Sequence, residues 1–540
     1  MEVSVMGSLQ VNLGRNNDVG FFSFSKNLNA RECNLKNNHN YSKGCNFGRS
    51  LVWPSKSVFG FTLRASATSE NGVSVVPDKA SNISRTVPVD GLKLYVGLPL
   101  DTVSNCNTIN HTRAIATGLK ALKLLGVDGV ELPVYWGVAE KEAMGKYQWT
   151  SYLTVVEMVQ ELGLKLHVSL CFHSSEEHKI QLPEWVSRVG ESEPGIYFTD
   201  RSGLQYKNCL SLAVDDLPVL DGKTPVEVYK AFCNNFKSTF SGFLGSTITA
   251  ISIGLGPEGE LRYPSHHNSV NSNGAGEFQC YDKFMLSNLK HHAEMHGNPL
   301  WGLGGPHDSP SYNYHNPISR GFFMENGGSW ESLYGDFFLC WYSNLLVSHG
   351  DRILSLAAST FKDMPITISG KVPLTHSWYR SRSHPSELAA GFYNTDSRGG
   401  YNAIAEIFSR NSCKMILPGM DLSDDHQSAA SLSSPEMLLK QITSSCRDHG
   451  VKISGQNSSA LGDSSGFEQI KKVLLDENVA TDLFTYQRMG AYFFSPQHFP
   501  LFTQFVRCLK LPIQSLDDLP AEGDETVKSL HGMDLKMQVA

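Results

Sequence analysis

The sequence lacks any uninterrupted apolar run of about 18 residues, the length that a transmembrane helix needs, so no membrane association is expected. Its 11 cysteines include no C-x-x-C pair and no Cys/His cluster at zinc spacing. Neither a disulfide framework nor a structural zinc site is therefore indicated. The adjacent histidine pairs His266–His267 and His291–His292 are interpreted as surface loop and helix residues, and no metal or cofactor is predicted.

An excess of basic residues is also missing. The formal net charge is −7, and because residues 1–66 carry eight Lys or Arg against three acidic residues, the remainder carries about −12. Proteins bind polyanions through patches of Lys and Arg, so no nucleic-acid partner is expected. The basic, Ser- and Asn-rich segment 1–66 is typical of a transit peptide, which predicts import into the chloroplast stroma; a disordered tail is the alternative.

The remaining chain is divided into three parts by composition. Residues 67–90 are interpreted as a polar, disordered linker, and residues 516–540 as a polar, acidic C-terminal tail without a packing pattern. Residues 91–515 are long enough for several domains, but they also fit a single large α/β barrel. We predict one domain for this part of the chain.

Apolar segments rich in β-branched residues alternate with helical stretches such as His111–Leu125 and Pro225–Phe240. This alternation predicts parallel strands joined by helices, and eight such units predict a (β/α)8 TIM barrel. Long insertions follow the third and fourth strands, and the larger, from Tyr263 to Met364, is expected to shape a binding cleft. The predicted strands are Leu92–Leu98, Gly129–Val134, Lys165–Cys171, Thr249–Gly254, Ile366–Lys371, Lys414–Leu417, Val451–Ser454 and Thr481–Gln487.

Chemically active side chains follow most of these strands. Active sites of α/β barrels lie at the carboxyl ends of the strands. A single charged residue in a loop is most often a solvated surface residue, but the coincidence at strand ends predicts one cleft. The residues concerned are His173, Glu260, Lys371, His376, Asp421, Gln456 and Arg488.

Several motifs carry a specific resemblance. Between residues 88 and 510, in order, Tyr135-Trp-Gly-Val-Ala-Glu140, Cys171-Phe-His173, Gly256-Pro-Glu-Gly-Glu-Leu-Arg-Tyr-Pro264 and Glu387-Leu-Ala-Ala-Gly-Phe-Tyr-Asn394 are similar to the plant β-amylase family. The resemblance implies a (β/α)8 barrel that releases maltose from the non-reducing ends of α-1,4-glucans with inversion. Inversion requires one carboxylic acid as proton donor and one carboxylate as base.

The resemblance places the proton donor on Glu260, for which a purely structural pairing with Arg262 is the alternative. The family's base, in a Gly-Glu-Asn-Ala-Leu pattern, falls on Gln456 in Gly455-Gln-Asn-Ser-Ser459. A glutamine amide cannot accept a proton from water near neutral pH. General-base catalysis typically contributes about 10²–10⁴-fold, so we expect little or no hydrolysis.

Other family positions are degenerate. An Asp that grips sugar hydroxyls falls on Pro133, a Trp on Ser377 and a loop Thr on Pro418, while the mobile lid is reduced to Ser174–Lys179. Drift among working variants would explain any one of these changes. His173, Lys371, His376, Asn457 and Arg488 match substrate-contact positions. These five either still bind glucan or persist as scaffolding around an empty cleft.

We therefore predict a catalytically silent, β-amylase-like plastid protein with a regulatory or glucan-sensing role in starch turnover, binding an α-1,4-glucan or maltooligosaccharide, or a protein partner in starch metabolism. One alternative is an active or weakly active β-amylase in which Asp421 or Asp463 serves as the base; that carboxylate would have to lie about 6.5–9.5 Å from the carboxyl of Glu260. Another alternative is an interaction scaffold that binds no sugar.

Overall fold

The computed structural model describes residues 91–266, 274–312, 314–458 and 464–510 of the 540-residue chain. The predicted transit peptide (1–66), linker (67–90) and C-terminal tail (516–540) lie outside the described residues, so their boundaries stay predictions. No helix of the described part is long and apolar enough to cross a membrane.

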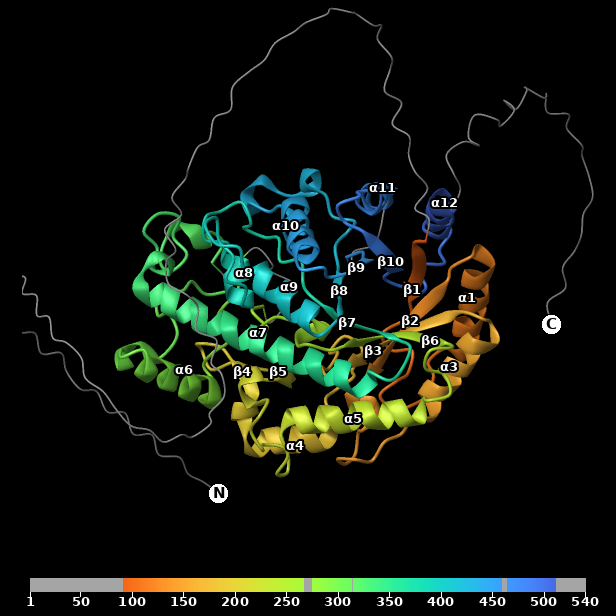
Figure 1. Cartoon of the computed structure of the whole chain (residues 1–540), viewed down its shortest axis with the longest axis horizontal. Coiled ribbons are helices and arrows are strands. Elements are labelled where there is room, and N and C mark those ends of the chain that lie inside the picture. The colour runs from red at the N-terminus through yellow and green to blue at the C-terminus, as the bar shows by residue number, and fades with distance from the viewer. Residues whose placement is uncertain (1–90, 267–273, 313, 459–463, 511–540) are drawn as a thin grey trace, which may run out of the picture. The chain divides into compact units, whose positions relative to one another are not determined.

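Eight parallel strands close into a barrel in the order β1-β10-β9-β8-β7-β6-β3-β2 (Figure 1). Each overlaps one of the eight predicted strands, so the predicted (β/α)8 architecture is confirmed. The strands are β1 (Lys93–Gly97), β2 (Gly129–Tyr135), β3 (Lys165–Cys171), β6 (Ile248–Ile253), β7 (Thr367–Lys371), β8 (Lys414–Leu417), β9 (Ile453–Gln456) and β10 (Thr481–Tyr486).

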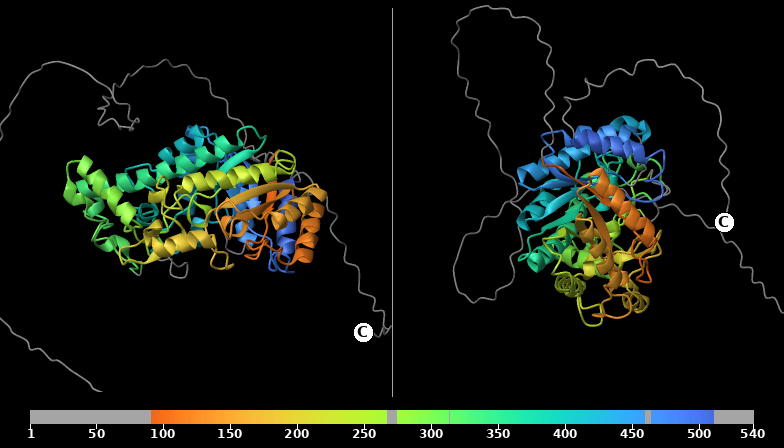
Figure 2. Two further views of the ribbon diagram at one scale, coloured as in Figure 1. Left: turned by 90° about the horizontal axis from the view of Figure 1, so that it is seen from below. Right: turned by 90° about the vertical axis from the view of Figure 1, so that its right-hand side faces the viewer.

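Helices surround the barrel, as the three views in Figures 1 and 2 show. They are α1 (Thr112–Leu125), α2 (Trp136–Ala139), α3 (Thr150–Glu161), α5 (Pro225–Thr239), α7 (Leu333–Phe361), α8 (Pro385–Ala390), α9 (Tyr401–Arg410), α10 (Pro435–Asp448), α11 (Ser464–Leu474) and α12 (Phe499–Lys510). Helix α5 begins with a capping box, in which Thr224 and Glu227 bond each other's backbone amides and so satisfy two donors of the first turn. Helices α1 and α5 confirm the two predicted helical segments.

The two long insertions are present where predicted. Between β3 and β6 the chain forms α4 (Glu184–Ser192) and an antiparallel hairpin of β4 (Tyr197–Thr199) and β5 (Gln205–Leu210). Between β6 and β7 it forms α6 (Lys283–Met295) before entering α7. Helix α6 lies at the left of Figure 1, and helix α1 lies on the opposite side of the barrel. The insertions therefore extend one side of the barrel.

The barrel interior contains polar side chains as well as apolar ones. Ser252 of β6 donates a hydrogen bond to the hydroxyl of Ser169 on β3 (2.8 Å), and Ser169 in turn donates to Glu131 on β2. Successive side chains of a strand point to opposite faces, so Glu131 and Pro133 face the same side of β2. The carboxylate of Glu131 thus lies two residues before Pro133, on the same inward-facing side of β2.

Candidate active site

The segment after β6 positions Glu260 at the carboxyl end of the barrel. A Cβ on Gly256 would lie 2.7 Å from the carbonyl oxygen of Glu260, so the turn requires glycine there. After the turn the chain pairs with β7, because the amide of Leu261 donates to the carbonyl of Lys371 at 2.9 Å. This renewed pairing places Glu260 opposite Lys371 at the end of β7.

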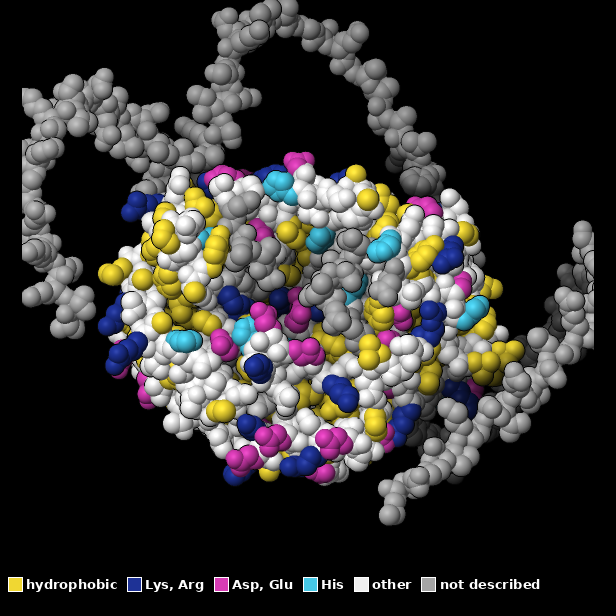
Figure 3. Space-filling model, turned by 180° about the vertical axis from the view of Figure 1, so that it is seen from behind, with side chains coloured by type: hydrophobic (Ala, Val, Ile, Leu, Met, Phe, Trp, Pro, Cys, Tyr) yellow, Lys and Arg dark blue, Asp and Glu magenta, His cyan; other side chains and the backbone are white. Residues whose placement is uncertain are grey.

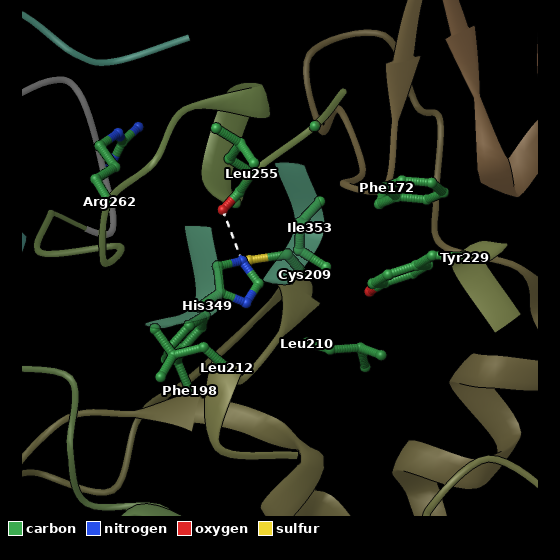
Figure 4. Close-up of a pocket in the computed structure, with 12 residues that line it drawn as sticks. Phe172, Phe198, Cys209, Leu210, Leu212, Tyr229, Leu255, Arg262, His349 and Ile353 are labelled. Carbon is green, nitrogen blue, oxygen red and sulfur yellow. Dashed lines mark hydrogen bonds between the residues drawn. The ribbon is translucent and has the colours of Figure 1, made fainter. Parts of the chain in front are cut away.

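A side chain of helix α7 holds the backbone of the segment after β6. Nε2 of His349 donates to the carbonyl oxygen of Leu255 at 3.0 Å, and its Nδ1 lies 2.7 Å from a carboxylate oxygen of Asp215. Figure 4 shows His349 reaching Leu255 in a small pocket whose other walls include Phe172 and Tyr229. A helix of the larger insertion therefore fixes the backbone that leads to Glu260.

The carboxylate of Glu260 is held by two cations. Nε of Arg262 lies 2.8 Å from one oxygen and Nζ of Lys371 lies 3.2 Å from the other. Burial alone would raise the pKa of Glu260, but the charges and hydrogen bonds of Lys371 and Arg262 outweigh burial and lower it. The predicted proton donor is therefore ionised near neutral pH in this arrangement.

His173 lies beside this group. Burial and the neighbouring charge of Lys371 lower its pKa to about 3, despite the opposing influence of Glu260. Its imidazole is consequently neutral at physiological pH and can donate one hydrogen bond and accept another. The structure thus brings three of the predicted residues, His173, Glu260 and Lys371, into one group with Arg262.

Gln456, predicted at the position of the general base, is the last residue of β9 and is 4% exposed. Its amide Nε2 donates to a carboxylate oxygen of Glu131 at 3.3 Å. The amide therefore acts as a donor to the protein, whereas a general base must accept a proton from water.

Glu131 is the residue of this site that sequence reasoning missed. Ser169 donates to its Oε1, while Gln456 and Gln487 both donate to its Oε2. Burial would raise the pKa of Glu131, but the charge of nearby His167 and the hydrogen bond from Ser169, among other contacts, lower it. Both oxygens of this carboxylate therefore accept hydrogen bonds from protein side chains.

A signal for Glu131 is present in the sequence. It is the one charged residue within the strand Gly129–Tyr135, and a charge inside an apolar strand that is buried on both faces needs partners. At this strand the resemblance to the family concerns Pro133. Pro133 is buried in β2 opposite Ser169 of β3, where it offers neither a carboxylate nor an amide donor.

The alternative base Asp421 also accepts hydrogen bonds from the protein. Its two carboxylate oxygens accept hydrogen bonds from the amide and the hydroxyl of Ser458, the latter at 2.6 Å. Asp421 therefore serves to hold the chain after β9. Asp463, the other residue proposed as a replacement base, lies outside the described residues.

Two predicted substrate-contact residues bond the backbone at the strand ends. Asn457 donates to the carbonyl of Gln487 at 2.7 Å and accepts from the amide of the same residue at 2.6 Å. Arg488 donates through Nη1 to the carbonyl of Leu98 at 2.9 Å. In this structure these side chains join the ends of β9, β10 and β1, and their binding of glucan stays a prediction.

The loop after β8 is fixed against β9. The Pro418–Gly419 turn places Gly419 at φ 78, in the left-handed region that favours glycine. The next residue, Met420, donates its amide to the carbonyl of Gln456 at 3.0 Å and covers Gly455, where a Cβ would lie 2.2 Å from the Met420 sulfur. This turn therefore offers the loop little freedom to switch.

The loop after β7 carries the remaining predicted residues. Nδ1 of His376 lies 2.6 Å from the hydroxyl of Ser433, and burial lowers the pKa of this histidine although Asp424 opposes the shift. Ser377 precedes Trp378, which is 4% exposed and packs into the protein. His376 thus contacts Ser433, and the structure describes no contact of its side chain with Glu260, Lys371, Glu131 or Gln456.

The shortened lid segment Ser174–Lys179 is pinned at both ends. Ser175 and Ile180 exchange backbone hydrogen bonds of 2.7 and 3.0 Å. Asn208 of β5 accepts from the hydroxyl of Ser174 at 2.8 Å and donates to Glu176 at 2.9 Å. The segment is a tight turn held in place by hydrogen bonds, whereas a lid that closes over a substrate must be able to move.

The visible surface carries charges of both signs. Acidic and basic side chains are interspersed over the face in Figure 3, without a large basic area on that face. In the ranges that the structure describes, no three His, Cys, Asp or Glu side chains come together as a metal site.

Comparison with known proteins matches residues 95–512 to the model of glycosyl hydrolase family 14. The chain is 56% identical over 532 residues to inactive beta-amylase 9 of Arabidopsis thaliana, covering 97% of this chain and 96% of that protein. It is 40% identical to beta-amylase 1, chloroplastic, of the same plant, covering 77% and 75%. The catalytic domain of a Paenibacillus polymyxa β-amylase superposes with a TM-score of 0.65 at 26% identity, covering 79% of this chain and all of that one.

Proposed function

The chain belongs to glycosyl hydrolase family 14, and we propose that it is a non-hydrolytic, β-amylase-like protein of plastid α-1,4-glucan metabolism with a glucan-sensing or regulatory role. The observation that carries this proposal is the amide of Gln456, which donates a hydrogen bond to Glu131 where an inverting glycosidase needs a base. The name of the 56% identical relative, inactive beta-amylase 9, supports the same conclusion.

Among the described residues, the other carboxylates near Gln456 are those of Glu131 and Asp421, and both are bound by protein donors. Both oxygens of Glu131 accept hydrogen bonds from side chains, and both oxygens of Asp421 accept from Ser458. An inverting mechanism has no covalent intermediate through which the water step could be avoided. Loss of the base therefore blocks the reaction even where the proton-donor position, Glu260, is retained.

The glucan-sensing part of the proposal rests on the group around Glu260. His173, Lys371 and Arg262 present a neutral imidazole and two cations beside one carboxylate, and such groups can hydrogen-bond sugar hydroxyls without cleaving the sugar. Plastid import is proposed from the basic segment 1–66, and the relative named beta-amylase 1, chloroplastic, supports it. A protein partner in starch metabolism would recognise the glucan-bound form of the protein.

The test of hydrolysis is maltose release from soluble starch by the protein without residues 1–66. Beta-amylase 1 of Arabidopsis, assayed at equal concentration, serves as the positive control. We expect a rate lower by at least about 10²-fold, the smaller contribution of a general base. A rate within tenfold of the control would reject the non-hydrolytic assignment and restore the alternative of an active β-amylase.

The test of glucan sensing is a thermal shift with maltose and maltooligosaccharides. A ligand that binds the folded state stabilises it by about 2.7 kcal/mol at 100 times its Kd. We expect a rise in Tm that Lys371→Met reduces. An unchanged Tm at high sugar concentration would favour the scaffold that binds no sugar.

A further inference from the structure

The side chains of Glu131 and Gln456 form a pair that links β2 to β9 across the inside of the barrel. Oε2 of Glu131 accepts from Nε2 of Gln456 at 3.3 Å and also from Nε2 of Gln487. Gln456 is 4% exposed. The structure describes no other hydrogen bond of the Gln456 side chain, so Glu131 alone orients this amide.

We infer that Glu131 is a positioning residue that locks an amide at position 456, so that a carboxylate cannot be accommodated there while Glu131 is present. The inference deepens the proposed function and rests on it only for its catalytic consequence. The lock itself is a statement about two neighbouring side chains and can be tested by stability alone.

The lock follows from the donors and acceptors of the pair. A glutamine presents N–H donors to Glu131, whereas an ionised glutamate at position 456 would present only acceptors. Two carboxylates at this distance cannot both ionise without a large cost, and one is forced to hold a proton. Replacing Gln456 by glutamate alone therefore gives either a repelling pair or a protonated carboxyl that cannot act as a base.

The same donors and acceptors define an exchange that keeps a hydrogen bond between positions 131 and 456. If Glu131→Gln is combined with Gln456→Glu, the new amide at 131 can donate to the new carboxylate at 456. The hydroxyl of Ser169 can still donate to the oxygen at 131. Gln487 can turn its amide so that Oε1, which has no partner among the described residues, accepts the second N–H.

The exchange also preserves charge. Glu131→Gln removes one negative charge and Gln456→Glu restores one on the neighbouring side chain, so the net charge of the barrel interior is unchanged. The guanidinium of Arg488, whose pKa burial lowers and Glu131 raises, keeps a carboxylate in its surroundings. The double variant is therefore matched to the native protein in size and charge, and it keeps the hydrogen bond between positions 131 and 456.

The experiment is a double-mutant cycle on the protein from which residues 1–66 have been removed. Tm is measured at neutral pH for four proteins: the native sequence, Glu131→Gln, Gln456→Glu and the double exchange. We expect Gln456→Glu to lower Tm by about 3 °C or more, and the exchange to recover at least half of that loss. Glu131→Gln alone is the matched control, because a general gain from removing a buried charge would appear there too.

Each stability outcome decides the lock. A non-additive recovery of at least half of the lost Tm supports it, and if Gln456→Glu yields no folded protein, folding of the exchange variant supports it equally. A Gln456→Glu variant as stable as the native protein, or an exchange that loses the sum of the two single changes, overturns it. These outcomes do not depend on any activity.

Maltose release by the same four proteins separates the lock from the proposed function. Release that rises at least tenfold in the exchange, and not in Gln456→Glu, supports the lock and shows that Glu131 kept the site silent. Strong release by the native protein would reject the proposed function, while the Tm cycle would still decide the lock. Recovery of Tm without release supports the lock and assigns the remaining block to Pro133, Pro418 or the short lid segment.

Discussion

Replacing Lys371 by methionine tests whether Glu260 is held as a carboxylate. The substitution keeps the length of the apolar stem but removes the ammonium that lies 3.2 Å from Oε1 of Glu260. Removing one partner of a fully buried ion pair costs about 3–5 kcal/mol. Lys371 is 28% exposed and Arg262 remains bonded to the other oxygen, so we expect a smaller loss, about 1–2 kcal/mol, at neutral pH.

The pH dependence gives the sign of the effect. Because the pKa of Glu260 is lowered in the folded protein, its ion pairs contribute stability above the carboxyl's unfolded pKa, and this contribution is lost as pH falls through the folded pKa. The difference in unfolding free energy between the native protein and Lys371→Met should therefore be largest near pH 7. It should shrink once the pH falls below the ordinary carboxyl range.

The assay is denaturant unfolding of both proteins at neutral and acidic pH. Lys472→Met is the matched control, since Nζ of Lys472 also lies 3.2 Å from a carboxylate, that of Glu436, but the lysine is 65% exposed. A surface pair of this kind contributes about 0–1 kcal/mol. Equal losses for the two variants at neutral pH, or a Lys371→Met loss that persists unchanged in acid, would refute the assignment of Glu260 as an ion-paired carboxylate.

Three further predictions concern the loops and strand ends. Asn208→Ala removes both side-chain contacts to the lid segment, so amide exchange there should accelerate, and unchanged exchange would contradict the anchoring by this side chain. Asn457→Ala leaves the backbone amide and carbonyl of Gln487 without their partner, which should cost about 1–3 kcal/mol of unfolding free energy; a neutral result in denaturant would assign the side chain to ligand contact instead. Gly455→Ala places a methyl group against Met420 and should cost about 1–3 kcal/mol, with recovery of Tm when Met420→Ala is added; no recovery would mean that the cost arises in the strand backbone.

The barrel was predictable because its signals are local. The predicted strand Lys165–Cys171 has the same bounds in the structure. An apolar run between polar helical segments can be recognised from residues that are neighbours in the sequence. The family motif likewise led directly to Glu260 and Gln456. What the motif could not give is the electrostatic state of Glu260, because Lys371 lies 111 positions away and the pairing of β6 with β7 brings it near.

Glu131 could not be assigned a role from sequence for the same reason. Its partners come from three other parts of the chain, and Gln456 and Gln487 are 325 and 356 positions away. Closure of the barrel places β2 two strands from β10 and three from β9. The sequence shows a charge in an apolar strand, but only the closed sheet shows which donors it meets.

The proposed loss of the base at Gln456 and the carboxylate of Glu131 are linked by the position of the negative charge. The site has not lost negative charge beside β9, because Glu131 supplies a carboxylate within hydrogen-bond distance of the Gln456 amide. The carboxylate of Glu131 accepts hydrogen bonds from three protein side chains, those of Ser169, Gln456 and Gln487, and it lies on another strand than the position of the family's base. The decisive feature is thus the location of the carboxylate. On strand β2 it is used to hold the barrel interior together, whereas on β9 it would be available to the water that an inverting reaction requires.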